Sequence, residues 1–238
     1  MSVARALVSG LLVTGMALAV VLVGAVTLFR ARRLYAGMAR IVARAVLCVY
    51  GIRLRVLGRM PLPRSQTVYI SNHTSTLDLF VLVALGLPNC RFFLSGFVRK
   101  FVPVGVIATA MGTFFTVPQD RPEERRRIFR RAAGILKRTG ESVYLSPEGS
   151  RITTGQIGRF NKGAFHIATD LQVPIVPMYI HTPRAIDPGR GYSTGPGTVT
   201  VHVLPAVDTT AWRVDDVAIN KEQVRDTFVR IQEELQCA

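Results

Sequence analysis

The stretch TVYISNHTSTLDLFVLVALGL, residues 67–87, indicates the fold of this chain. Its first part is rich in β-branched and aromatic residues and predicts a strand over 67–71. Its last part is an apolar run that predicts a helix over 76–87. The polar segment SNHTSTLD separates the two. A strand followed at once by a helix is the unit from which α/β folds are built.

The same alternation continues toward the C-terminus. Short apolar runs predict further strands at 91–95, 113–117, 142–146, 175–181 and 198–204. Longer runs with helical spacing predict helices at 122–138, 162–171 and 218–235. We therefore expect an α/β fold, with a mixed sheet flanked by helices and an N-terminal membrane helix. Residues 65–238 would form the main domain.

The N-terminal region has the properties of a membrane anchor. Residues 6–29 form an uncharged run of 24 residues. At about 1.5 Å per residue, a helix of that length crosses a hydrocarbon core of about 30 Å. The run exceeds the apolar core of a signal peptide, which disfavours cleavage. Arginines are more frequent after the run than before it, so the positive-inside rule places the rest of the chain on the cytoplasmic side. We expect residues 1–33 to be a transmembrane or re-entrant anchor.

The charge of the chain indicates an anionic partner. Lys and Arg total 30 against 15 Asp and Glu, a net charge of +15, and no acidic residue precedes Asp78. A basic region beside a membrane-length apolar run favours an anionic membrane over nucleic acid. We expect a basic amphipathic helix and a linker in residues 34–64, the helix lying either in the membrane interface or on the main domain. The sparse cysteines favour a reducing compartment.

The polar segment at 71–78 contains a candidate catalytic pair. His73 and Asp78 are five positions apart, which is about 140° around a regular helix and too far for contact. They meet if His73 lies on the loop and Asp78 in the first helical turn. An Asp bound to one imidazole nitrogen leaves the other nitrogen free to take a proton from an alcohol. In the alternative interpretation, Ser75 and Asp78 form a capping box and His73 is a buried core residue.

Two later segments carry candidate substrate-binding residues. GTFFTVPQDR ends in Arg121, which can bind a phosphate through paired N–H groups. Capping of the next helix is the alternative. SPEGSR follows a predicted strand and places Glu148 and Arg151 at its carboxyl end, where open α/β sheets bind ligands. An ordinary turn with a surface ion pair is the alternative there. VPIVPMYI, residues 173–180, is either a buried strand or the wall of an acyl groove.

Together these segments resemble the glycerolphosphate and lysophosphatidate acyltransferase family over residues 65–205. The marks of that family are an H-x4-D motif, a G-x-x-F-x-x-x-R-like block, an F-P-E-G-T-R block and a V-P-I-V-P block. They correspond here to Asn72–Asp78, Gly112–Arg121, Ser146–Arg151 and Val173–Pro177. Ser146 stands in place of the family's Phe, Ser150 in place of Thr, and VPQD precedes Arg121. These departures leave the identity of the acceptor open.

The resemblance implies an O-acyltransferase of the 1-acylglycerol-3-phosphate type, with residues 65–238 as the acyltransferase domain. His73 would act as the general base and Asp78 would orient it. The acceptor oxygen would attack the thioester of acyl-CoA or acyl-carrier protein directly. No cofactor and no metal are expected besides this donor. The phosphate and glycerol of the acceptor would be bound by Arg121, Glu148, Gly149, Ser150 and Arg151.

The favoured reaction acylates the sn-2 hydroxyl of lysophosphatidate to give phosphatidate. Another acceptor with the same chemistry, a lyso-ornithine lipid or another lysophospholipid, is the nearest alternative. A membrane-anchored lipid hydrolase or thioesterase is an alternative of a different class. A serine hydrolase would need a G-x-S-x-G elbow between a strand and a helix, and no such elbow is predicted. A lipid-binding protein without activity is the third alternative.

Overall fold

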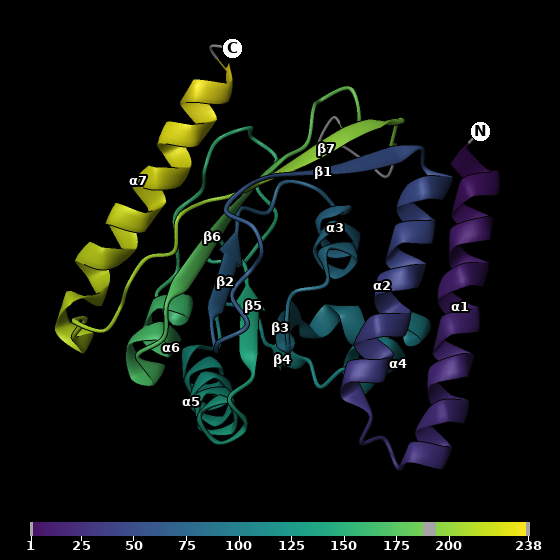
Figure 1. Cartoon of the computed structure of the whole chain (residues 1–238), viewed down its shortest axis with the longest axis horizontal. Coiled ribbons are helices and arrows are strands. Elements are labelled where there is room, and N and C mark those ends of the chain that lie inside the picture. Colours follow the sequence, from purple (N-terminus) through teal and green to yellow (C-terminus); the bar gives the residue numbers. More distant parts are fainter. Residues whose placement is uncertain (1, 188–193, 237–238) are drawn as a thin grey trace.

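The computed structural model describes residues 2–187 and 194–236, and its centre is a seven-stranded sheet (Figure 1). The order of the strands is β1-β7-β6-β2-β5-β3-β4. All neighbours are parallel except β6 and β7, which are antiparallel. The strands are β1 (Ile52–Gly58), β2 (Val68–Ser71), β3 (Cys90–Ser95), β4 (Phe114–Thr116), β5 (Ser142–Leu145), β6 (Ile175–His181) and β7 (Gly197–Val203).

Helices cover both faces of the sheet, which confirms the predicted α/β class with a mixed sheet (Figure 1). The helices of one face are α1 (Ser2–Thr27), α2 (Arg32–Val49), α3 (Asp78–Leu85) and α4 (Val102–Ala110). Those of the other face are α5 (Pro122–Thr139), α6 (Gly163–Leu171) and α7 (Val217–Gln236). Two short 3₁₀ helices, η1 (Gly96–Lys100) and η2 (Val214–Asp216), precede α4 and α7.

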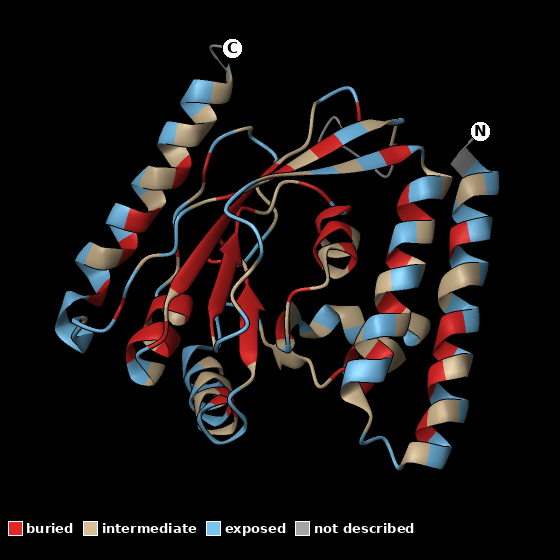
Figure 2. Ribbon diagram, in the orientation of Figure 1, coloured by how far each residue is buried: buried red, intermediate tan, exposed pale blue. Residues whose placement is uncertain are grey.

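The strand sequences explain why the sheet is covered on both sides. Successive side chains of a strand point to opposite faces. In β2, Val68 and Ile70 pack with α5, α6 and α7, whereas Tyr69 packs with the helices of the opposite face. All four residues of β2 and all four of β5 are buried, as Figure 2 shows in red. Strands buried on both faces read as continuous apolar runs, which is why the sequence revealed them.

One strand and one α-helix of the structure were not predicted, besides the two short 3₁₀ helices. Residues 34–64 were expected to hold a helix and a linker, but their second half contains β1, which pairs with β7 along its whole length. In β1 apolar residues alternate with Arg53 and Arg55, so the strand is more polar than the buried central strands and was not recognised. Helix α4 was also missed, because VPVGVIATA has no polar face to reveal a helical period. The predicted ends of the other strands and helices lie within two residues of those observed.

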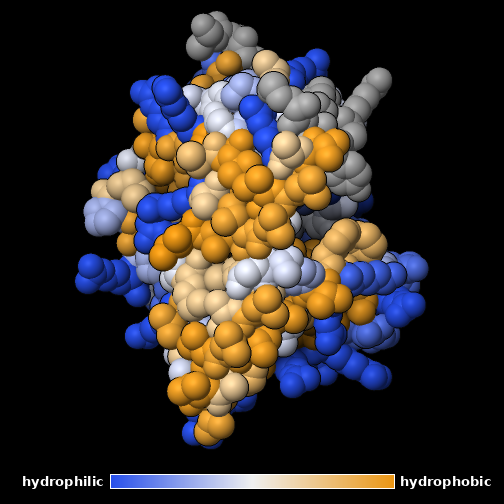
Figure 3. Space-filling model, turned by 90° about the vertical axis from the view of Figure 1, so that its right-hand side faces the viewer, coloured by the Kyte–Doolittle hydropathy of each residue, from blue (hydrophilic) through white to orange (hydrophobic). Residues whose placement is uncertain are grey.

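Helix α1 is long and apolar enough to cross a membrane, and 28% of its apolar window is buried in the protein. Its inner side packs along α2 and α4, with Met16 and Val20 in the core. Its outer side exposes a stripe of large apolar residues that includes Leu11, Leu18 and Leu22. Figure 3 shows this side of the molecule as a broad apolar surface bordered by hydrophilic side chains. One side of α1 therefore packs against the rest of the protein, and the other side is suited to an apolar environment.

Candidate active site

The predicted catalytic pair comes together with the predicted substrate-binding residues of the segment at 148–151 because β2 and β5 are neighbours in the sheet, whereas Arg121 follows β4. The loop after β2 carries His73, and the loop after β5 carries Glu148 and Arg151. These two strands are parallel, so their carboxyl ends lie at the same edge. The backbone N–H of Ile152 donates to the carbonyl of His73 at 2.8 Å, which joins the two loops directly. The site thus lies where open α/β sheets bind ligands.

The geometry of His73 and Asp78 is that of an oriented imidazole. Nδ1 of His73 lies 2.8 Å from Oδ2 of Asp78. Asp78 is buried at 1% exposure, whereas the His73 side chain is 34% exposed. A proton on Nδ1, facing the carboxylate, leaves Nε2 without a proton and able to accept one. Asp78 begins α3 and His73 precedes it on the loop, as the pair requires in order to meet.

The capping-box interpretation of this segment is met in part. Oδ2 of Asp78 also accepts from the backbone N–H groups of Thr74 at 2.9 Å and Ser75 at 3.0 Å, which is one half of a capping box. The other half is absent, because Oγ of Ser75 accepts from the N–H of Leu77 at 3.0 Å and not from that of Asp78, and the N-cap position of α3 is Leu77. These bonds form the turn before α3. They also hold Asp78 in the position from which it binds the imidazole, so capping and orientation are one arrangement.

Glu148 holds the backbone of the His73 loop. Its Oε2 accepts from the N–H of His73 at 2.6 Å and its Oε1 from the N–H of Gly158 at 2.8 Å. The side chain is buried. Burial raises the pKa of Glu148 above its ordinary value, and the two backbone hydrogen bonds oppose that shift. Each oxygen accepts one backbone N–H and keeps a second acceptor site, so the predicted contact of Glu148 with the acceptor stays a prediction.

The turn after β5 is shaped by Gly149 and carries Arg151. Gly149 has a φ of 72°, in the left-handed region, and a Cβ there would lie 2.8 Å from Nδ2 of Asn161. The same Cβ would lie 2.9 Å from Nε2 of Gln119, so the loop after β4 also reaches this turn. Nη1 of Arg151 is buried and has no hydrogen-bond partner among the described residues. A buried guanidinium N–H without a partner is suited to an anionic ligand.

Residues 53–181 of the chain match the family model described as Acyltransferase, more than half of its length. The chain belongs to the acyltransferase family. It is 30% identical over 191 residues to the 1-acyl-sn-glycerol-3-phosphate acyltransferase of Saccharomyces cerevisiae, covering 78% of this chain and 61% of the yeast protein. It is 30% identical over 189 residues to the alpha form from Mus musculus, covering 79% of this chain and 66% of the mouse protein.

A solved structure has the same fold. The 1-acyl-sn-glycerophosphate (LPA) acyltransferase from Thermotoga maritima superposes with a TM-score of 0.77 over 100% of this chain and 99% of that one. The sequence identity is 22%, so this likeness shows the fold alone. The curated relatives are longer, and the matched part of this chain spans about two thirds of their length or less.

In this member of the family Arg121 and Ser150 lie at the surface. Arg121 precedes α5, its side chain is 63% exposed, and its ion pair with Glu124, at 3.6 Å, is a solvent-exposed one. Such a pair contributes little in water and does not hold the guanidinium in place. Ser150 is exposed in the turn. The substrate contacts predicted for these two residues stay predictions.

Asn72 is part of the site and had no role in the sequence-based prediction. Its Nδ2 donates to the carbonyl of Ile180 at 3.0 Å, and its Oδ1 accepts from the N–H of Ile180 at 2.7 Å. Asn72 is buried and ties the end of β2 to β6. A polar residue at the end of a buried strand was the available signal, but its partner lies 108 positions away.

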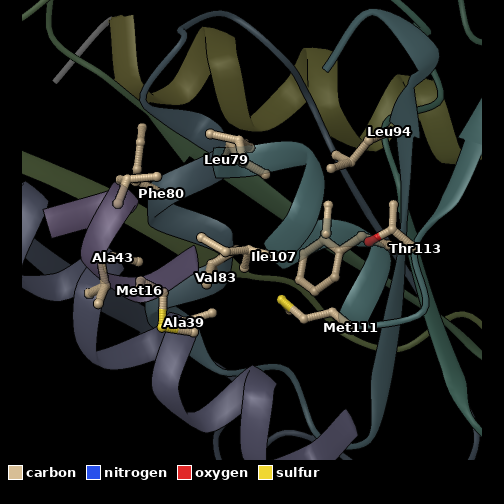
Figure 4. Close-up of a pocket in the computed structure, with 15 residues that line it drawn as sticks. Met16, Ala39, Ala43, Leu79, Phe80, Val83, Leu94, Ile107, Met111 and Thr113 are labelled. Carbon is tan, nitrogen blue, oxygen red and sulfur yellow. The ribbon is translucent and has the colours of Figure 1, made fainter. Parts of the chain in front are cut away.

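A small apolar cavity of about 70 Å³ lies between the sheet and the helices of the α1–α4 face (Figure 4). Strand β6, which contains most of VPIVPMYI, does not contribute to its lining, so that segment is the buried strand of the two alternatives. The lining comes from α1 (Met16), α2 (Ala39, Ala43), α3 (Leu79, Phe80, Val83), β3 (Phe92, Leu94) and α4 (Val104, Ile107), among others.

The hydrolase alternative depends on a nucleophile elbow. The letters GYSTG at residues 191–195 match G-x-S-x-G, although residues 191–193 lie outside the described part of the chain. An elbow requires a helix immediately after the serine. The next element here is strand β7, which begins at Gly197. The match is therefore not in the context that a serine nucleophile needs.

Proposed function

We propose that this protein transfers a fatty acyl group from acyl-CoA or acyl-carrier protein to the sn-2 hydroxyl of lysophosphatidate, giving phosphatidate, with no cofactor besides the acyl donor. The observation that carries the proposal is the 2.8 Å hydrogen bond between His73 Nδ1 and Asp78 Oδ2, made by an imidazole that is partly open to substrate. The yeast and mouse relatives are named 1-acyl-sn-glycerol-3-phosphate acyltransferases, which supports this acceptor.

The chemistry follows from the oriented imidazole. Nε2 of His73 takes the proton of the acceptor hydroxyl as its oxygen attacks the thioester carbonyl. The new carbon–oxygen bond forms and the carbon–sulfur bond breaks. The leaving thiolate takes the proton back from His73. Asp78 stays ionised throughout and stabilises the imidazolium that exists between the two transfers.

The acceptor's phosphate is proposed to lie beside Arg151. The buried Nη1 of Arg151 lacks a protein partner among the described residues, and a phosphate oxygen would satisfy it through a charge-assisted bond. Gly149 and Ser150 would line the glycerol from the same turn. Arg121 would approach the phosphate from the loop before α5. Glu148 would hold the backbone of His73 so that the imidazole faces the bound acceptor.

Part of the acyl chain is proposed to occupy the apolar cavity. Carbons placed there contact mainly apolar side chains from α1, α2, α3, α4 and β3. Helix α3, which contributes Leu79 and Phe80 to this wall, begins with Asp78. The cavity and the catalytic pair therefore share one short helix, which supports a path for the chain toward His73.

The membrane is proposed as the partner of α1, with the catalytic domain on the cytoplasmic side. Helix α1 packs along α2, which carries Arg32, Arg33, Arg40 and Arg44. If α1 crossed the bilayer in this packing, α2 would enter the hydrocarbon with it. Each arginine at the bilayer centre would then cost about 2.5–3.5 kcal/mol or more. Of the two predicted arrangements, the re-entrant one, with the outer stripe of α1 in one leaflet, fits these contacts better.

The test uses membranes that contain the full-length protein, labelled acyl-CoA or acyl-carrier protein, and a panel of lysolipids. We expect labelled phosphatidate from lysophosphatidate, lost in His73→Ala and kept in His166→Ala, which changes a histidine of α6 on the opposite face of the sheet. Product from another lysolipid alone would discard the proposed acceptor. Free fatty acid as the sole product would favour the hydrolase, and no His73-dependent product would favour a lipid-binding protein.

A further inference from the structure

Two phenylalanines and a valine are exposed at the junction of η1 and α4. Phe97 is 58% exposed, Phe101 55% and Val102 68%. We call these three residues the aromatic lip. The rings of Phe97 and Phe101 meet edge to face, with centroids 5.3 Å apart. Large apolar side chains that are exposed next to one another are a feature of interaction surfaces.

The aromatic lip lies at the catalytic edge of the sheet. Helix η1 follows β3 directly, and β3 runs parallel to β5, whose carboxyl end carries Glu148 and Arg151. The start of α4 is therefore on the same edge as the loops of the active site. From there α4 runs back along the sheet, and its Val104 and Ile107 line the apolar cavity (Figure 4). One short segment thus joins the exposed aromatic rings to the cavity wall.

The charges around the aromatic lip fit an anionic lipid surface. Arg99 lies with its guanidinium 5.1 Å from the ring centroid of Phe115, and Lys100 with its ammonium 5.6 Å from that of Phe97. No acidic residue occurs between Asp78 and Asp120 in the sequence. Aromatic rings beside basic side chains are the composition of protein segments that lie at the headgroup level of a membrane.

The local packing holds the aromatic lip in one position. Oγ of Ser95 accepts from the N–H of Phe97 at 3.2 Å and caps η1. Helix α4 approaches η1 at Gly105, where a Cβ would lie 2.8 Å from the carbonyl oxygen of Arg99. A rigid presentation of two rings loses little conformational entropy on binding, which favours insertion.

The aromatic lip is carried partly by α4, a helix that packs against α1. The outer stripe of α1 faces away from the protein, and Figure 3 shows apolar surface over much of this side. We propose that Phe97, Phe101 and Val102 insert into the headgroup–acyl boundary of an anionic bilayer and hold the α4 wall of the cavity against the lipid. This inference rests on the membrane association in the proposed function and adds a second contact, at the catalytic edge.

The first experiment measures lipid contact without catalysis. Trp212 is the only tryptophan of the chain and is replaced by Phe, so that one introduced tryptophan reports alone. Phe97→Trp is compared with Ile219→Trp, because Ile219 is an equally exposed apolar residue, at 63%, on α7. With vesicles of phosphatidylcholine and phosphatidylglycerol, we expect the emission of Phe97→Trp to shift to the blue and to be quenched by lipids brominated on their acyl chains. If the blue shift and the quenching of Phe97→Trp are no larger than those of Ile219→Trp, the proposal is overturned, and the aromatic lip would instead bind a protein.

The second experiment separates substrate entry from chemistry. In Phe97→Ser/Phe101→Ser we expect the apparent KM for vesicle-borne lysophosphatidate to rise about tenfold, with activity on a monomeric short-chain acceptor unchanged. Ile219→Ser should match wild type on both substrates. An unchanged KM on vesicles would overturn the role of the aromatic lip in substrate access. Failure of the proposed reaction would appear as inactivity of wild type on both acceptors, and the quenching result would stand independently of it.

Discussion

Replacement of Glu148 by Gln tests whether this residue positions the catalytic histidine or binds the acceptor. In the structure each carboxylate oxygen accepts one backbone N–H, from His73 at 2.6 Å and from Gly158 at 2.8 Å. An amide has only one acceptor oxygen, so its NH₂ group would face one of these donors. If the amide oxygen stays on Gly158, the N–H of His73 loses its partner.

The expected magnitude follows from that lost partner. A buried N–H without a partner costs about 1–3 kcal/mol. Part of this cost is offset because Gln carries no charge, and burial of the charged carboxylate is unfavourable, as the raised pKa of Glu148 indicates. The larger effect is on geometry, because a shift of about 1 Å in a catalytic group lowers the rate about a hundredfold. We expect kcat of Glu148→Gln to fall about a hundredfold while the KM for the acceptor stays within about threefold.

The assay is steady-state kinetics with varied acceptor, together with thermal unfolding of each variant. Glu141→Gln is the matched control, since Glu141 is also a shielded glutamate and pairs with Arg91 at 2.6 Å, next to the start of β5 at Ser142. It should lower the Tm and leave kcat unchanged. A Glu148→Gln enzyme with normal kcat and a strongly raised KM would refute the positioning role and favour direct contact with the glycerol.

Further substitutions at the site and in the cavity have expected outcomes of their own. Asp78→Asn should lower kcat by about 10³–10⁴-fold, because the amide favours the wrong tautomer of the imidazole; steady-state kinetics would check this. Gly149→Ala should weaken acceptor binding, because Cβ collides with Asn161 and Gln119; the acceptor KM would report it. Ile107→Trp should fill the cavity and shift the donor preference to shorter chains, measured with an acyl-CoA series. Burial raises the pKa of Glu148 in the folded protein above its pKa in the unfolded chain. The contribution of Glu148 to stability is therefore fully present below the unfolded-state pKa and is lost as the pH rises through the folded-state pKa. In Glu148→Gln, whose side chain does not titrate, the Tm should decline less as the pH rises between these two pKa values.

Much of the fold was predictable because the central strands have helices on both faces. Such strands, β2, β5 and β6, are continuous apolar runs that sequence patterns detect well. Strand β1 lies at the edge of the sheet and mixes arginines with apolar residues, so local pattern did not distinguish it from a linker. The formation of β1 depends on its pairing with β7, which lies far along the chain. The prediction missed helix α4 for the opposite reason, since this helix is apolar on all sides.

The site was predictable in its residue types and less so in their roles. The spacing of His73 and Asp78 allowed a contact, and the contact is present. Capping and orientation of His73 were treated as alternatives, whereas one carboxylate oxygen of Asp78 binds both the imidazole and the backbone N–H groups of the turn. The use of Glu148 by the backbone could not be inferred, because it depends on the approach of two loops that follow neighbouring strands. The cavity could not be inferred either, since its wall comes from five separate elements.

The N-terminal helices support the elements that carry the candidate active site, besides their proposed role as an anchor. Nε of Arg40 and Nε of Arg44 both donate to the carbonyl of Ala84, at 3.3 and 3.2 Å, near the end of α3. Helix α3 begins with Asp78, so α2 is bound to the helix that orients His73. Helices α1 and α2 also supply cavity wall. Deletion of both helices would therefore remove the support of α3 and open the cavity to water, even where the sheet still folds. The basic residues of α2 thus have a structural use as well as an affinity for anionic lipid.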